Sequence, residues 1–166
     1  MNNKLNPSNH DLIHIGMFLH ANKTKTVTLK FDTTPNSAVI SDIQKLTETF
    51  PNSVNVMLKG SIADYVFLKN LPQLAGLSLF MFEKFEFDYL KCFSNLKRLR
   101  ISLFTDKLIS LENYKDCLEN LETLVASNTI KERDFWSQLK QLSSLFISNN
   151  QFDFMTIDQL PFLKKL

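Results

Sequence analysis

Apolar and polar positions along the chain follow two alternating patterns. In short stretches every second residue is apolar, as in Leu77 with Leu79 and Leu99 with Ile101, which is typical of strands that bury one face. Residues 37–50 instead carry apolar side chains three or four positions apart, which predicts a helix. Further helical segments are expected at 8–20, 62–69, 85–93, 108–118 and 132–140. The pattern therefore predicts short strands alternating with short helices.

One motif recurs along most of the chain. Its most complete copy, LKQLSSLFISNNQF at 139–152, fits LxxLxxLxLxxNxF at every specified position, with Asn150 as the polar residue. Earlier copies begin at Leu118, Phe93 and Leu71. A weaker copy spans 50–58, and the weakest consists of Val27 with Leu29. A further copy begins after the most complete one, with Leu160, Leu163 and Leu166. Equivalent strand positions from Val27 to Leu166 are spaced by 29, 21, 22, 25, 21 and 21 residues. Because one unit cannot bury its apolar side alone, the units are expected to stack into a solenoid.

The repeat resembles that of the leucine-rich-repeat family, well over 50–166 and loosely over 1–49. The resemblance implies an α/β solenoid with a parallel sheet on its concave side, short helices on its convex side, a protein-binding role and no catalytic residues. We expect a single domain over 1–166, with capping and irregular repeats at 1–49 and regular repeats at 50–166. The lack of cysteine-rich flanks makes it similar to irregular intracellular members of the family.

The last residue suggests that the chain stops within a repeat. Leu166 aligns with Leu145, which begins a strand, so the solenoid is expected to be truncated at its C-terminus. A sheet edge left open there would favour self-association.

The strand pattern also predicts a surface. Residues next to the buried leucines should point to the opposite, concave side of the sheet. The predicted partner-binding residues on that side are Lys30, Met57, Lys59, Ser78, Phe80, Arg98, Arg100, Ser102, Val125 and Phe146. Arginine and aromatic residues are enriched at binding hot spots, which favours docking of an acidic or aromatic-bearing protein segment. The alternative is that these are ordinary exposed residues.

Composition narrows the class of partner. Nineteen basic residues against 17 acidic ones give a net charge of +2, too balanced for a protein that depends on phosphate contacts, so no nucleic acid partner is expected. No apolar run approaches the length of a membrane span, and the first residues lack a signal-peptide pattern. Two cysteines do not form a disulfide framework, which favours a reducing compartment. The expected location is the cytoplasm, or a host cell reached without a classical signal peptide.

Candidate chemistry is sparse. His10 and His14 lie four positions apart, a spacing that zinc sites use, but the sequence brings no third ligand to them. Cys92 and Cys117 occupy equivalent places in successive repeats and are interpreted as small apolar fillers of the convex layer. All three histidines lie within the first 20 positions, so no base is expected near either cysteine. We therefore predict no cofactor, no metal and no enzymatic activity.

The leading functional expectation is a protein-recognition module that binds another protein on its concave face, as part of an effector or adaptor. The alternative is the targeting arm of a larger enzyme, for example a ubiquitin ligase, whose catalytic part lies outside this chain.

Overall fold

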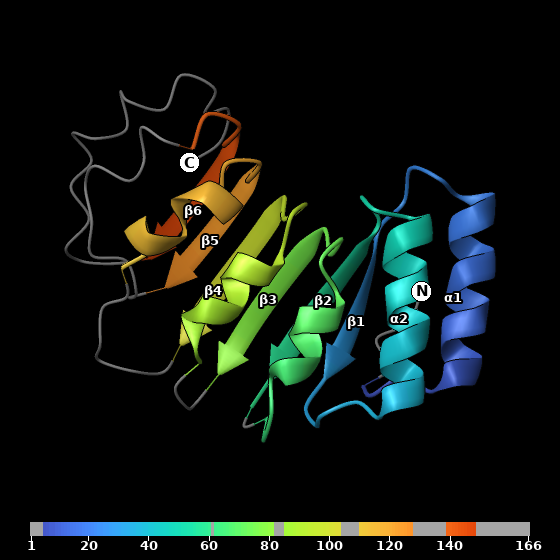
Figure 1. The fold of residues 1–166 in the computed structure, drawn as a ribbon. Helices are drawn as coiled ribbons and strands as arrows, with labels where there is room; N and C mark the ends of the chain where they lie inside the picture. Colours follow the sequence, from blue (N-terminus) through green and yellow to red (C-terminus); the bar gives the residue numbers. More distant parts are fainter. Residues whose placement is uncertain (1–4, 61, 82–84, 104–109, 128–138, 149–166) are drawn as a thin grey trace.

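The protein forms a single curved sheet with helices along one side (Figure 1). The computed structural model describes residues 5–60, 62–81, 85–103, 110–127 and 139–148. The elements are α1 (Asn9–Ala21), β1 (Val27–Phe31), α2 (Ser37–Thr49), β2 (Val54–Lys59), η1 (Val66–Asn70), β3 (Gly76–Met81), η2 (Phe87–Cys92), β4 (Arg98–Leu103), η3 (Glu112–Cys117), β5 (Thr123–Ser127) and β6 (Ser144–Ser148), where η marks a 3₁₀ helix. Asn150 lies outside the described residues, and so does the helix expected at 132–140, except for positions 139 and 140.

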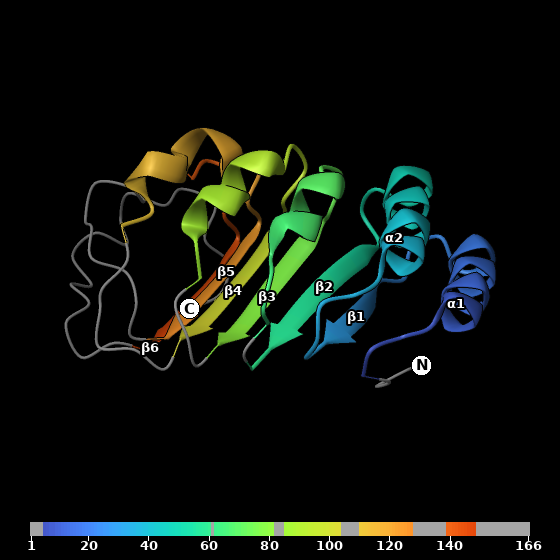
Figure 2. The ribbon, with the colours of Figure 1, turned by 60° about the horizontal axis from the view of Figure 1, so that its bottom comes forward.

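The six strands pair in sequence order, and every pair is parallel. Helical segments follow the outer side of the curved array and the strands follow its inner side (Figure 2). This arrangement confirms the predicted solenoid with a parallel sheet and convex helices.

The buried leucines stack in register, as the repeat predicts. Leu77, Leu99, Leu124 and Leu145 are direct partners on neighbouring strands, and each is at most 2% exposed. A second column pairs Leu58, Leu79, Ile101 and Ala126, all fully buried. Leucines that precede the strands close the core from the convex side: Leu71, Leu74, Leu96, Leu118, Leu121, Leu139 and Leu142. The core is therefore continuous from repeat to repeat.

The alignment of β1 needs a correction. The sequence spacing equates Val27 with Val56, but in the structure Val27 pairs with Val54 and Leu29 pairs with Val56. The spacing of the first repeat is thus 27 residues, from Leu29 to Val56, rather than 29. A shift of two residues keeps the same side chains on the same face, so the faces of β1 are as expected.

Three of the described convex helices, η1, η2 and η3, are shorter than the sequence pattern suggests and are 3₁₀ helices. The segments η1, η2 and η3 contain five or six residues each, whereas α2 contains 13. A repeat of 21 to 25 residues leaves few residues for the convex side. Because a 3₁₀ helix rises about 2.0 Å per residue, against 1.5 Å for an α-helix, it spans the convex side with fewer residues. The 27-residue first repeat has room for a full α-helix.

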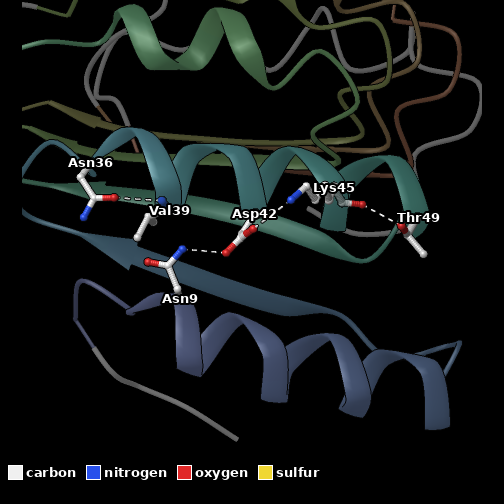
Figure 3. Close-up of polar contacts among 6 residues, drawn as sticks. All are labelled: Asn9, Asn36, Val39, Asp42, Lys45 and Thr49. Atoms are coloured by element: carbon white, nitrogen blue, oxygen red, sulfur yellow. Dashed lines mark hydrogen bonds and ion pairs between the residues drawn. The ribbon is translucent and has the colours of Figure 1, made fainter.

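The helices α1 and α2 lie side by side at the N-terminal end of the sheet (Figure 1), and Figure 3 shows polar contacts within and between them. Asn9 on α1 donates a hydrogen bond to Asp42 on α2 at 2.7 Å, and this bond, with that from Lys45, holds the pKa of the Asp42 carboxyl below its usual range. Gly16 permits close packing, since a Cβ there would lie 3.3 Å from Leu46 Cδ2. Asn36 caps α2 by accepting a hydrogen bond from the amide of Val39.

The start of α1 is fixed by a capping box, which gives a first prediction. The amide and hydroxyl of Ser8 donate to Asp11, while the Asp11 amide donates to the Ser8 hydroxyl. Ser8→Ala removes the cap, so the free energy of unfolding should fall by about 1 kcal/mol. Denaturation of the variant by urea measures this loss, and Thr24→Ala, in the exposed turn before β1, serves as a control with little effect. An unchanged midpoint for Ser8→Ala would contradict the role of the cap.

The free edge of β1 is partly covered. Leu5 forms a parallel bridge with Lys30, and the Asn6 amide donates to the Lys30 carbonyl at 2.8 Å. The Asn6 side chain also donates to Asp32, and the Asp32 amide donates back to Asn6. These contacts block further strand pairing at this edge, which natural sheets commonly protect.

Aromatic rings and lysines connect the convex segments of successive repeats. Phe85 packs edge-on against Tyr65 and Phe87, with ring centroids 5.1 and 5.2 Å apart. Lys69 of η1 lies over the ring of Tyr89 in η2, and Lys91 of η2 lies over that of Tyr114 in η3. We call this set, Tyr65, Phe85, Phe87, Tyr89, Tyr114, Lys69 and Lys91, the convex ladder. The contact of Tyr65 with Phe85 and the two lysine–tyrosine contacts thus join one repeat to the next, whereas Phe85 and Phe87 lie in the same repeat.

Candidate functional site

The inner side of the sheet presents its residues in rows that run across the strands. The Cα pairing places Thr28, Asn55, Gly76, Arg98, Thr123 and Ser144 in a first row; Lys30, Met57, Ser78, Arg100, Val125 and Phe146 in a second; and Lys59, Phe80, Ser102, Ser127 and Ser148 in a third. We call these three rows the concave face. Because the residues between them point into the core, this face is the part of the sheet available to a partner.

All ten residues singled out from the sequence lie in these rows. Six of them form the complete second row, three lie in the third row, and Arg98 lies in the first. Lys59 and Arg100 are exposed, and Phe146 is 56% exposed. The other seven are partly buried by their neighbours. Their place on one face is thus observed, while their role in binding stays a prediction.

Asn55 and Gly76 are two of the five first-row residues that were not among the predicted site residues. They border a hollow of about 190 Å³ together with Met57, Ser78 and Arg100. The hollow forms because β3, in the middle of the sheet, carries only Gly76 and Ser78 at these outward positions. Strand alternation could have found both residues, since each lies two positions before a residue that was chosen.

The first row holds the Arg98 side chain in a defined position. Its Nε donates to Asn55 Oδ1 at 3.0 Å, and its Nη2 donates to the carbonyl of Asn52, also at 3.0 Å. The Asn55 side chain reaches across Gly76 to do so, and a Cβ on Gly76 would lie 2.9 Å from Asn55 Cγ. Partial burial lowers the pKa of the Arg98 guanidinium, with Glu122 opposing this shift. A glycine at position 76 is therefore required for the bridge between β2 and β4.

This bridge gives a second prediction. Asn55→Ala removes the acceptor for Nε, so the guanidinium of Arg98 should become mobile and the free energy of unfolding should fall by about 1.5 kcal/mol. Relaxation of the Arg98 Nε resonance in ¹⁵N NMR measures the mobility, with Arg100 as the internal comparison. A rigid Arg98 in Asn55→Ala would show that the bridge does not hold it.

Arg100 is held differently. Its guanidinium lies over the ring of Phe80, 4.7 Å from the ring centroid, on the neighbouring strand. Such a contact is worth about 0.5–1 kcal/mol at exposed sites, so it orients Arg100 without burying it. Both arginines of β4 thus border the hollow.

The charge of the concave face has one sign. Its charged members are Lys30, Lys59, Arg98 and Arg100, and the three rows contain no aspartate or glutamate. Glu122, outside the three rows, lies close enough to Arg98 to oppose the lowering of its pKa, and the chain as a whole is nearly neutral. The face therefore offers a concentrated positive charge.

The candidate histidines and cysteines lie outside the concave face. The rings of His10 and His14 meet edge-on with centroids 4.5 Å apart, and no group of three metal-ligating side chains occurs within the described residues. Cys92 and Cys117 are free and half-buried. The Cys117 thiol donates to the Tyr114 carbonyl, and burial raises its pKa, which disfavours the nucleophilic thiolate. Over the described ranges, no helix is long and apolar enough to cross a membrane.

Comparison with known proteins bears on the fold. No protein-family model matches the chain, and no curated protein matches it. Among solved structures, an internalin from Listeria monocytogenes strain 4b F2365 is similar, with a TM-score of 0.55 and 20% sequence identity. The similarity covers 83% of this chain and 39% of the internalin, so the chain spans well under half of that protein's length. This structural similarity, together with the six parallel strands of the described residues, shows that the fold is a leucine-rich-repeat solenoid.

Proposed function

We propose that this chain is a protein-recognition module that binds a partner protein on its concave face. The observation that carries the proposal is the concave face itself, which extends across all six strands and combines basic, aromatic and aliphatic side chains. Arginine and aromatic residues are the types that dominate binding energy at protein interfaces. The similarity to an internalin supports the fold on which this surface depends.

Within this proposal the chain is part of an effector or adaptor that acts in the cytoplasm or inside a host cell. Support for a reducing compartment comes from Cys92 and Cys117, which are both free.

The test uses two variants with equal changes in charge. Arg100→Glu with Val125→Glu changes two adjacent members of the second row, while Lys115→Glu with Asn120→Glu makes the same change at exposed positions outside the concave face. Each protein is used to capture partners from a cell lysate, and captured proteins are cross-linked and identified by mass spectrometry. We expect the concave variant to lose a partner that the wild type and the control retain.

Cross-links identify the surface in contact. They should join the partner to the concave face, and circular dichroism should show that both variants are folded. Retention of every partner by the concave variant, or equal loss from both variants, would contradict the proposal.

A further inference from the structure

We infer that the concave face binds an extended, acidic peptide segment of its partner, with a carboxylate seated at the hollow beside Arg98 and Arg100. This inference rests on the proposed function, which it narrows from a protein partner to a segment of defined shape and charge. Four observations carry it: the sign of the charge, the geometry of the two arginines, the dimensions of the rows, and the apolar residues next to them.

The basic residues of the concave face favour an acidic partner. The three rows hold four basic residues and no acidic one, so the charged side chains that a segment meets within the rows are all basic. Complementary charge of this kind speeds association and excludes partners of the same charge. The low net charge of the chain means that this field is local rather than a property of the whole molecule.

The two arginines suit a carboxylate. Arg98 is fixed by Asn55 and by the Asn52 carbonyl, so little side-chain freedom is left to lose when an anion binds. Arg100 is oriented by Phe80 but remains exposed. Because Arg98 Nε and Nη2 already donate to Asn55 and Asn52, the two parallel N–H donors that bind a carboxylate come from Arg100, and Arg98 adds its remaining Nη donors. The partial burial of Arg98 strengthens such a pair relative to one in open water.

The dimensions select an extended segment. Six strands about 4.8 Å apart give a row about 24 Å long, which corresponds to about seven residues in extended conformation. The three rows cover about 13 Å along the strands, so the concave face is longer across the strands than along them. An extended peptide therefore fits across the strands of the described part of the concave face.

The second row also supplies apolar residues on both sides of Arg100. Val125 and Phe146 follow Arg100 in register on β5 and β6, and Phe146 is 56% exposed. On the other side Met57 borders the hollow. A segment with its acidic residue at Arg100 would thus place neighbouring side chains over Met57 in one direction and over Val125 and Phe146 in the other.

The experiment selects peptides from a displayed library of random nine-residue sequences on the full chain. We expect the selected peptides to be enriched in aspartate and glutamate and to contain aliphatic or aromatic residues nearby. Their affinity, measured by fluorescence anisotropy, should fall at least tenfold in Arg98→Ala with Arg100→Ala, and also when the acidic residues of the peptide are changed to their amides. The matched control, Lys115→Ala with Lys140→Ala, should bind within twofold of the wild type.

Each other outcome overturns the inference in an identifiable way. Selected peptides without acidic enrichment, or an empty selection, would show that the segment is not acidic. A single-stranded oligonucleotide of equal charge that binds more tightly than the peptides, with the same dependence on both arginines, would show that the wrong class of partner was inferred. Loss of binding in Val125→Ser or Phe146→Ala, without any loss in the arginine variant, would leave the concave face as the binding surface and reject its acidic ligand. The capture experiment described above fails or succeeds independently of these results.

Discussion

Replacing Leu99 by alanine is expected to lower the free energy of unfolding by about 3 kcal/mol, because the side chain is 1% exposed and lies between its partners Leu77 and Leu124. The truncation removes buried apolar surface and leaves a cavity in the middle of the leucine column. Since single domains are stable by only about 5–15 kcal/mol, the loss is a large share of the total. Urea denaturation followed by circular dichroism measures it.

Two comparisons test whether the loss of stability comes from the stacked leucines. Leu5→Ala, at a leucine that is 42% exposed, should lower stability by less than about 1 kcal/mol. Leu77→Ala combined with Leu99→Ala should depart from additivity, whereas Leu29→Ala combined with Leu145→Ala, which lie at opposite ends of the same column, should be additive. A loss below about 1 kcal/mol for Leu99→Ala, or strong coupling between the distant pair alone, would contradict the stacked core.

The second large effect is expected on the convex side. Phe85 is 2% exposed and packs against the rings of Tyr65, Phe87 and Tyr89. Phe85→Ala should therefore lower the free energy of unfolding by about 3–5 kcal/mol and weaken the near-ultraviolet circular dichroism of the aromatic rings. Phe87→Leu, at a half-buried ring of the same convex ladder, is the matched control and should cost less than about 1.5 kcal/mol.

This comparison separates the convex ladder from general apolar packing. Equal effects of the two substitutions would mean that Phe85 is not its central ring. A stable Phe85→Ala variant with unchanged near-ultraviolet signal would mean that the convex segments do not depend on these contacts.

Periodicity was sufficient to predict the sheet and its two faces. Leu77, Leu99, Leu124 and Leu145 recur at nearly constant spacing, and a strand with alternating burial has no freedom to turn such residues outward. The partners of β1 were harder to predict, because Val27, Leu29 and Phe31 are all apolar and a shift of two residues satisfies the pattern equally well. Only packing against β2 decides between the alternatives.

Contacts across strands could not be predicted from the pattern. The bridge from Arg98 to Asn55 depends on the space above Gly76, and that space follows from the register of three different strands. The 3₁₀ character of η1, η2 and η3 was equally inaccessible, since in five or six residues a spacing of three fits both kinds of helix. Alternation therefore located the candidate site on the correct face, while its hollow and the fixed arginine came from the structure.

The central claim is that successive repeats pair as neighbouring parallel strands, which brings Ser78, Arg100 and Val125 side by side on the concave face. Its most direct test is the set of backbone nuclear Overhauser effects between strands in a ¹³C,¹⁵N-labelled sample. The account predicts parallel cross-strand contacts between β3 and β4 at Ser78 and Arg100, and between β4 and β5 at Arg100 and Val125. Antiparallel contacts, or contacts that join β3 directly to β5, would contradict it and remove the surface on which both proposals depend.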